Sequence, residues 1–177
     1  MRNASTKRFR LELLAPGHRR ALVKFSRANR ALFEQFNEAL GDDAYTDEGL
    51  RFAFDASIRD AAEGLACTLV LADERGSIWG QATLHRFAPF TSPLELTYQT
   101  DHGGRGLGIA TCLVRALIEL AARDSGVHVD ATTTCDNGPS IRVLQKLGFR
   151  RMGEAEDAVL RCGIVPCARY VWGSARS

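Results

Sequence analysis

The sequence lacks any long run of apolar residues. None of its segments is apolar for long enough to span a bilayer, and the N-terminal stretch lacks the apolar core of a secretory signal peptide. Neither sign of charge dominates, because 23 lysines and arginines nearly balance 21 acidic residues and leave a net charge of +2. Such a balance gives no reason to expect a polyanionic partner. We therefore expect neither a nucleic acid nor a membrane among its partners.

Paired cysteines are also lacking. The five cysteines are an odd number, stand at irregular spacings and form no C-x-x-C pair. They therefore predict neither a disulfide framework nor a zinc site. We expect a reduced, cytoplasmic protein that holds no metal.

The 177 residues show no internal repeat, linker or low-complexity segment. This length suits one domain, residues 1–177, with an ample core. We expect it to be ordered from about residue 6 to residue 173.

One glycine-rich stretch, 103–111, follows a strand-like run over 94–100 and opens the most regular helical pattern of the chain. The apolar residues of that pattern share one helix face, at Ala110, Leu113, Val114, Leu117 and Ala121. A helix start offers unpaired backbone N–H groups at the positive end of the helix dipole, and glycine lets a ligand approach the backbone closely. The stretch predicts a site for a phosphate or pyrophosphate, with a plain tight turn as the alternative.

Two common phosphate-binding patterns fit this stretch poorly. A P-loop needs Gly-Lys-Ser or Gly-Lys-Thr, which does not occur. The dinucleotide pattern G-x-G-x-x-G/A fails at Thr111, although Asp130 lies near the distance expected of a ribose-binding acid. About a hundred residues precede the glycines, and too few follow them for a full six-stranded sheet. A nicotinamide-dependent oxidoreductase is therefore only a minor alternative.

Two motifs in this region resemble a known family. Arg105-x-x-Gly108-x-Ala110 is similar to the Q/R-x-x-G-x-G/A motif of the GCN5-related N-acetyltransferases, in which the loop holds the pyrophosphate arm of acetyl-CoA. A second block, 137–149, resembles the N-x-x-S-x-x-V-L-x-K-L-G-F block of the branch that includes RimJ- and RimL-type protein N-terminal acetyltransferases. The blocks stand in the family's order. The resemblance covers about residues 94–153 firmly and the N-terminal part more loosely, beginning with a strand-like run over 6–11.

The remaining patterns agree with the fold that this resemblance implies. One or two helices are expected over 18–40, and single helices over 46–64 and 140–147. Strands are expected over 67–71, 77–87 and 127–134, with one or two more after 149. Thr46 is expected to cap the second helical segment, and Gly148 to end the last one. We expect an α/β (α+β) protein with the acyl-CoA N-acyltransferase fold. This fold is a mixed central sheet with helices on both faces and a splay between two central parallel strands. In the family, the helical segment that ends near Gly64 lies over the acceptor site.

The resemblance implies direct transfer of an acetyl group from acetyl-CoA to a primary amine, on a small molecule or at a peptide N-terminus. Backbone N–H groups around 97–99 would bind the thioester oxygen, and the same strand edge would pair with pantetheine. The residues expected to bind acetyl-CoA lie at the strand end, in the loop and in the second block: Thr97, Tyr98, Gln99, Thr100, Arg105, Gly106, Leu107, Gly108, Ile109, Ala110, Thr111, Asn137 and Ser140.

Many family members protonate the leaving thiolate with a tyrosine of the second block, but Leu144 stands at that position here. Ser140 is the expected substitute, and its alternative role is to cap the backbone of the helix. We expect Glu95 to be the general base, directly or through a water. As the alternative, a carboxylate alternating with Leu94 and Leu96 could simply face solvent.

His85 and His102 compete with Glu95 for the role of base. Cys135 lies near the predicted site but has no evident histidine partner for a covalent mechanism. Because Leu144 replaces the tyrosine, a non-catalytic acyl-CoA-binding or regulatory module on the same fold stays open as an alternative. A monomer and a homodimer both fit the family.

Overall fold

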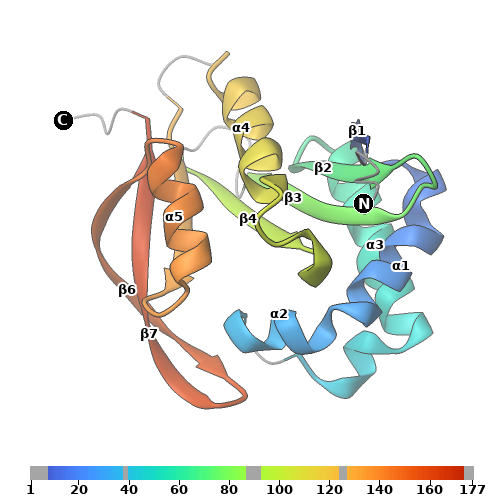
Figure 1. Ribbon diagram of the computed structural model, residues 1–177, viewed down its shortest axis with the longest axis horizontal. Helices are drawn as coiled ribbons and strands as arrows, with labels where there is room; N and C mark the ends of the chain where they lie inside the picture. Colours follow the sequence, from blue (N-terminus) through green and yellow to red (C-terminus); the bar gives the residue numbers. More distant parts are fainter. Residues whose placement is uncertain (1–7, 38–39, 87–92, 124–126, 174–177) are drawn as a thin grey trace, which may run out of the picture.

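The computed structural model describes residues 8–37, 40–86, 93–123 and 127–173. Residues 6 and 7 of the expected first strand and residue 87 of the expected hairpin lie outside these ranges. Within them, seven strands form one mixed sheet in the order β1-β2-β3-β4-β5-β7-β6 (Figure 1). The strands are β1 (Phe9–Leu13), β2 (Ala66–Asp73), β3 (Ile78–Arg86), β4 (Leu94–Thr100), β5 (Val129–Thr134), β6 (Arg150–Leu160) and β7 (Gly163–Trp172).

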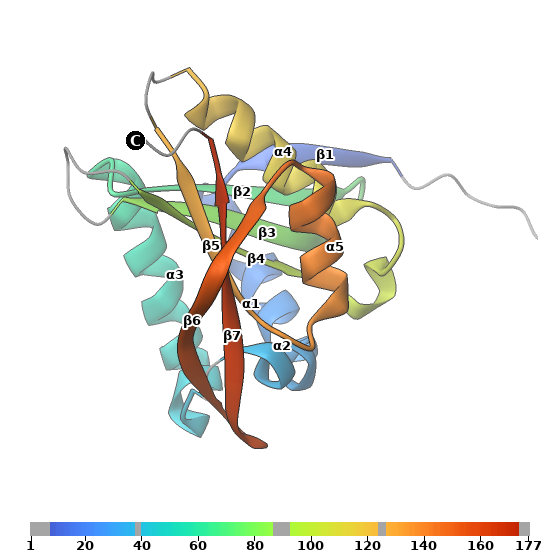
Figure 2. The same cartoon turned by 90° about the vertical axis from the view of Figure 1, so that its left-hand side faces the viewer.

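The helices cover both faces of this sheet, as expected. They are α1 (Arg19–Ala28), α2 (Arg30–Phe36), α3 (Asp47–Ala62), α4 (Ile109–Ala121) and α5 (Gly138–Lys146), with short 3-10 turns η1 (Pro16–His18), η2 (Asp42–Tyr45) and η3 (His102–Gly104). In Figure 2, α4 lies above strands β1 to β4, and α1, α2 and α3 lie below them. No helix of the described ranges is long and apolar enough to cross a membrane.

The sheet is open at its centre. β4 and β5 run parallel and pair at only two positions, Leu94 with Val129 and Glu95 with Asp130. Beyond them β4 stays paired with β3, and β5 stays paired with β7 to the end of the strand. Each strand thus follows a different neighbour, and the expected splay between two central parallel strands is confirmed.

Helix α4 packs very closely on the sheet. Its Leu113 and Leu117 are fully buried. Gly80 of β3 permits this approach, because a Cβ there would lie 2.8 Å from Ile109 Cγ2 and 2.9 Å from Leu113 Cδ1. The start of α4 is therefore held at a fixed height over β3 and β4.

Two helix ends follow the local sequence signals. Thr46 caps α3, since its side chain accepts the Gly49 N–H at 3.1 Å. Gly148, with φ 86°, ends α5 in a Schellman arrangement, in which its N–H donates to Gln145 O and the next N–H donates to Leu144 O. Both signals were predicted.

The expected helical region 18–40 holds two helices that meet at Asn29, and its residues 38 and 39 lie outside the described ranges. Some element boundaries differ from expectation: α5 begins at Gly138 instead of 140, and β5 begins at Val129 instead of 127. The earlier start of α5 has a physical reason: Asn137 caps it, and proline is well suited to the first helical turn.

Candidate active site

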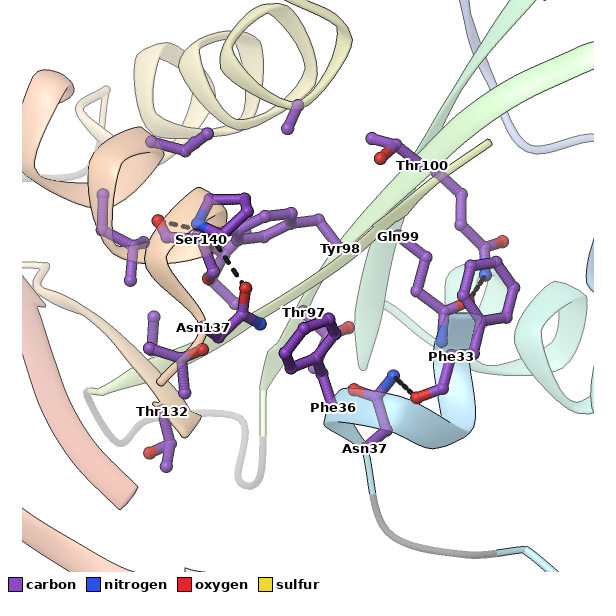
Figure 3. A pocket seen from close by; sticks show the side chains of 18 of the residues that line it. Phe33, Phe36, Asn37, Thr97, Tyr98, Gln99, Thr100, Thr132, Asn137 and Ser140 are labelled. Carbon is purple, nitrogen blue, oxygen red and sulfur yellow. Dashed lines mark hydrogen bonds between the residues drawn. The ribbon is translucent and has the colours of Figure 1, made fainter. Parts of the chain in front are cut away.

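A cavity of about 310 Å³ opens where β4 and β5 diverge (Figure 3). Its walls come from α2, β3, β4, β5 and α5, together with Arg105 and Ala110 at the start of α4. The cavity therefore reaches from the helix that begins at the glycine-rich loop to the helices on the opposite face of the sheet.

The hydrogen bonds at the two ends of β4 show which way its backbone groups point. The Leu94 N–H donates to His128 O at 3.0 Å, toward β5. Just past the other end, the Asp101 N–H donates to Trp79 O at 2.9 Å, toward β3. Successive residues of a strand direct their backbone groups to opposite sides. Even-numbered residues of β4 thus face β5, and odd-numbered residues face β3.

Beyond the last pair with β5, the splay leaves the β5-facing backbone groups of Tyr98 and Thr100 directed into the cavity. This narrows the expected thioester-binding amides, 97–99, to the amide of Tyr98, because those of Thr97 and Gln99 face β3. A strand edge with free N–H and C=O groups can pair with an extended amide-containing chain.

The odd-numbered side chains of β4 form a polar ladder with their partners on β3. The ladder consists of the cross-strand pairs Glu95 with His85, Thr97 with Thr83, and Gln99 with Gln81. Two contacts connect its strands: Gln81 Nε2 donates to Gln99 Oε1 at 3.2 Å, and His85 Nε2 lies 3.3 Å from Thr97 Oγ1. All of the ladder except His85 lines the cavity.

Sequence reasoning named His85 but missed Gln81 and Thr83, the cavity-lining residues of the β3 half of this ladder. Its signal was present, because Gln81, Thr83 and His85 alternate with the apolar Ala82 and Leu84. Period-two alternation indicates a strand with one polar face.

Helix α2 forms the wall opposite the ladder. Its Leu32, Phe33 and Phe36 line the cavity with Asn37. The helical segment ending near Gly64 was expected over the acceptor site, but α2 and not α3 lines this cavity. No α3 residue lines the cavity, since α3 packs behind α1 and against β2.

The loop that feeds α4 has one packed part and one open part. A Cβ on Gly104 would lie 2.6 Å from Ile109 Cδ1, so a side chain there would force Ile109 to shift. Gly106 and Gly108 have φ of 79° and 76°, and nothing lies within 4 Å of where a Cβ would stand on either. The outer side of this turn is therefore accessible to a ligand.

The open turn fits a pyrophosphate. Gly108 is the N-cap residue of α4, so the first-turn amides of Ile109, Ala110 and Thr111 have no partner within the helix. Those amides, the helix dipole and the exposed Arg105 guanidinium all favour an anion.

The expected loop residues lie in different places around this turn. Arg105 and Ala110 line the cavity, whereas Gly106, Leu107, Gly108, Ile109 and Thr111 do not. The Ile109 side chain is buried in the core, so only its backbone is available to a ligand.

Asn137 and Ser140 lie together at the start of α5. The Asn137 Oδ1 accepts the Ser140 N–H at 3.2 Å and so caps the helix. The capping alternative for the Ser140 hydroxyl is therefore wrong. That hydroxyl instead lies 2.6 Å from the hydroxyl of Tyr98, which reaches across from β4 (Figure 3). Burial raises the pKa of Tyr98 to about 12, against a smaller opposing effect of the hydrogen bond with Ser140.

The candidate bases differ in their access to the cavity. Glu95 lines it, whereas His85, His102 and Cys135 do not. The side chain of His102 is 76% exposed, on the 3-10 turn before the loop. Leu144, at the position of the family's tyrosine, lines the cavity and is fully buried.

The acid expected of a nicotinamide site is already engaged. Asp130 Oδ2 accepts the Arg169 Nε–H at 2.8 Å across the β5–β7 pair. It is thus held by a cation of the neighbouring strand and not presented to a ribose. Among the described residues, no group of three or more His, Cys, Asp or Glu side chains is placed to hold a metal ion.

An open parallel strand pair, a free strand edge and an anion site at a helix start define an acyl-CoA-dependent acyltransferase. The sequence comparison agrees, because a model of the acetyltransferase (GNAT) domain matches residues 8–150. The chain belongs to the GNAT family and is an N-acetyltransferase with acetyl-CoA as the donor.

Solved structures of the same fold cover nearly the whole chain. The ribosomal-protein-S5-alanine acetyltransferase from Vibrio fischeri has a TM-score of 0.83 and 19% identity over 93% of this chain and 92% of that one. The acetyltransferase from Salmonella typhimurium that modifies the N-terminal serine of ribosomal protein L7/L12 has a TM-score of 0.80 and 20% identity over 97% of each chain. Spermidine N-acetyltransferase from Vibrio cholerae, in complex with CoA and spermine, has a TM-score of 0.74 and 14% identity over 93% of this chain and 94% of that one. At these identities the likeness is one of fold.

Proposed function

We propose that the protein acetylates the α-amine of a peptide or protein N-terminus, with Glu95 as the general base and Ser140 as the group that assists the leaving thiolate. The acceptor side of the cavity carries this proposal. It is lined by one carboxylate and by neutral amide and hydroxyl groups of the polar ladder, facing the apolar wall of α2.

This lining suits an acceptor with one amine and several amide groups. Gln81, Gln99 and Asn37 can hydrogen-bond peptide N–H and C=O groups, and Phe36 offers an apolar surface for a first side chain. A polyamine carries several positive charges and would call for several carboxylates. Among the described lining residues only Glu95 is acidic, so a single amine is the better match.

Two of the similar structures agree with this acceptor class. The Vibrio fischeri and Salmonella typhimurium enzymes are named for acetylating ribosomal proteins, the latter at an N-terminal serine. The Vibrio cholerae enzyme acts on spermidine, so the fold alone does not fix the acceptor.

The donor side follows from the open edge of β4 and the loop. Acetyl-CoA supplies an acetyl group activated as a thioester. The amides of the 105–111 loop hold its pyrophosphate, and the β5-facing edge of β4 pairs with pantetheine. The Tyr98 N–H then donates to the thioester oxygen as negative charge develops there. The amide of Asn137 has its N–H groups left for pantetheine, because only its oxygen caps α5.

Glu95 and Ser140 act on opposite sides of the reacting carbon. Glu95 projects from the ladder face, where it can take a proton from the amine directly or through one water. Ser140 projects from α5 toward the gap, where it can donate to the sulfur. The two groups are therefore divided between the acceptor side and the donor side.

An acetyl-transfer assay on four kinds of acceptor tests the proposal. These are peptides that differ in their first residue, the same peptides with a blocked N-terminus and an internal lysine, spermidine, and an aminoglycoside. We expect mass spectrometry to find one acetyl group on the α-amine of some free peptides and none on the blocked ones. Transfer to spermidine or to the aminoglycoside, but to no peptide, would contradict the proposed acceptor class.

Leu144 supports a second candidate, a non-catalytic acyl-CoA-binding module. A buried leucine cannot protonate a thiolate. Calorimetric binding of acetyl-CoA without turnover of any amine would favour this candidate.

A further inference from the structure

A tyrosine hydroxyl and a serine hydroxyl meet across the gap between β4 and α5. The oxygens of Tyr98 and Ser140 lie 2.6 Å apart, although the residues are 42 positions apart in the chain (Figure 3). Both residues line the cavity. Leu144, one turn further along α5, is fully buried and has no hydroxyl to offer.

Either hydroxyl could be the donor of the 2.6 Å bond, and the bond lengths favour Tyr98. The single hydroxyl hydrogen of Tyr98 has two acceptors within reach, Ser140 Oγ at 2.6 Å and Ser140 O at 3.3 Å. O–H···O bonds cluster near 2.7–2.8 Å and seldom exceed about 3.0 Å, so Oγ is the better acceptor. A phenol is also a stronger donor than an aliphatic alcohol. When Tyr98 donates, the hydrogen of Ser140 is free for a third group.

We propose that Tyr98 is a positioning residue for acetyl transfer, which turns the hydroxyl hydrogen of Ser140 toward the sulfur of acetyl-CoA. This inference rests on the proposed function, which places the sulfur beside Ser140. Leu144 stands where many family members have a tyrosine in the second motif. In this protein a different tyrosine, Tyr98 of β4, supplies a phenol that acts through Ser140.

The role of the pair is hydrogen-bond donation and not proton transfer. The amine lone pair forms the C–N bond, the C–S bond breaks, and its electron pair leaves on sulfur. Glu95 takes the proton that the amine nitrogen loses, directly or through a water, so the products are the amide, the thiolate and a protonated Glu95, and the total charge is unchanged. Tyr98, with a pKa of about 12, keeps its proton beside a thiol whose ordinary pKa is about 8.5. Its donation to Ser140 Oγ strengthens the bond that Ser140 makes to sulfur.

Tyr98→Phe tests this directly, because it removes the hydroxyl and keeps the ring. We expect kcat to fall about five- to thirtyfold, as the loss of one such hydrogen bond gives, while KM for acetyl-CoA stays within about twofold. Ser140→Ala should lower kcat by at least as much. The double variant should be no slower than Ser140→Ala alone, because Tyr98 acts only through the serine.

Changing the leaving group distinguishes the proposed role of Tyr98 from a merely structural one, because a structural defect would not depend on the acidity of the thiol that leaves. A thioester of nitrothiophenol releases a far more acidic thiol than CoA and needs less help from a hydrogen bond. The ratio of kcat/KM between the unaltered protein and Tyr98→Phe should therefore shrink toward one with this donor. Tyr170→Phe, which removes a hydroxyl from a buried tyrosine of β7, is the matched control and should keep full activity with both donors.

Three results would overturn the inference while the proposed function stands: full activity of Tyr98→Phe, additive losses in the double variant, or a defect that is the same with both thioesters. Absence of acetyl transfer by the unaltered protein would overturn both.

Discussion

At the scale of single residues, the proposed chemistry depends on Glu95, the one carboxylate among the described residues that line the cavity. Glu95→Gln keeps the size and polarity of the side chain but removes the base. We expect kcat to fall about 100-fold or more near neutral pH, with KM for acetyl-CoA little changed, since general-base catalysis contributes on this order. Initial rates with a peptide acceptor measure this.

Glu48→Gln is the matched control for that substitution. Glu48 lies exposed in the first turn of α3, away from the cavity, and its replacement should leave the rate unchanged. If the Glu95→Gln protein is as fast as the unaltered protein, Glu95 is not the general base, and a water or His85 becomes the candidate.

Tyr98 links stability to alkaline pH. Burial raises its pKa from 10.0 to about 12, so the folded state holds a proton that the unfolded state releases earlier. The resulting stability is complete below pH 10 and is lost as the pH rises from 10 toward 12. The loss should amount to roughly 2–3 kcal/mol in the free energy of unfolding.

Urea unfolding at several pH values measures this change. Tyr98→Phe has no group to titrate there, so its unfolding free energy should fall less steeply over the same interval. Parallel curves for the two proteins would show that the hydroxyl is not buried as described.

At the scale of elements, the loop before α4 needs glycine for two reasons, its left-handed backbone and the open space for a pyrophosphate. One pair of variants separates these two reasons. Gly108 and Gly76 have nearly the same φ, 76° and 75°, and open space where a Cβ would stand. Alanine at either should cost about 1–2 kcal/mol of stability, because the left-handed backbone disfavours a side chain. Only Gly108→Ala should raise KM for acetyl-CoA, about fivefold or more, since its methyl group points to where the pyrophosphate would approach. Equal KM values for the two variants would place the anion elsewhere.

Helices α1 and α2 are connected to this loop by Asn29. This residue is 2% exposed, and its Nδ2 donates to Phe25 O and to Asp101 Oδ2, both at 2.9 Å. Its Oδ1 accepts the His102 N–H at 3.0 Å. The bend between α1 and α2 is thereby joined to the segment that leads into the anion site.

Asn29→Ala should therefore disturb both substrates. We expect a loss of about 1–3 kcal/mol of stability and a higher KM for acetyl-CoA and for the acceptor, because α2 lines the proposed acceptor side of the cavity. Leu22→Ala weakens the packing of α1 without touching the loop, and is the control for lost stability alone. If both variants raise KM equally, Asn29 has no special part in joining the two sites.

At the scale of the whole molecule, local sequence signals predicted most helices and strands, whereas the long-range pairing of the strands was predicted much less completely. Thr46, Gly148 and the alternation over 94–100 depend on residues close in sequence, and each predicted its element correctly. The insertion of β7 between β5 and β6 depends on pairing between distant segments, which no local pattern encodes.

The candidate site also contains residues that local motifs predicted and contacts that they did not. Its loop and its α5 residues stand in recognisable motifs and were expected. The contact of Tyr98 with Ser140 arises only when the splayed strand and α5 come together in space. That α2 and not α3 lines the cavity likewise depends on packing that the sequence pattern does not reveal.

The central claim is that acetyl-CoA lies in the gap between β4 and β5. A crystal structure of the protein with CoA tests it most directly. We expect the pyrophosphate on the amides at the start of α4, pantetheine paired with the β5-facing edge of β4, and the sulfur within hydrogen-bond reach of Ser140 Oγ. CoA bound away from the gap, or β4 and β5 paired along their full length with CoA outside them, would contradict it.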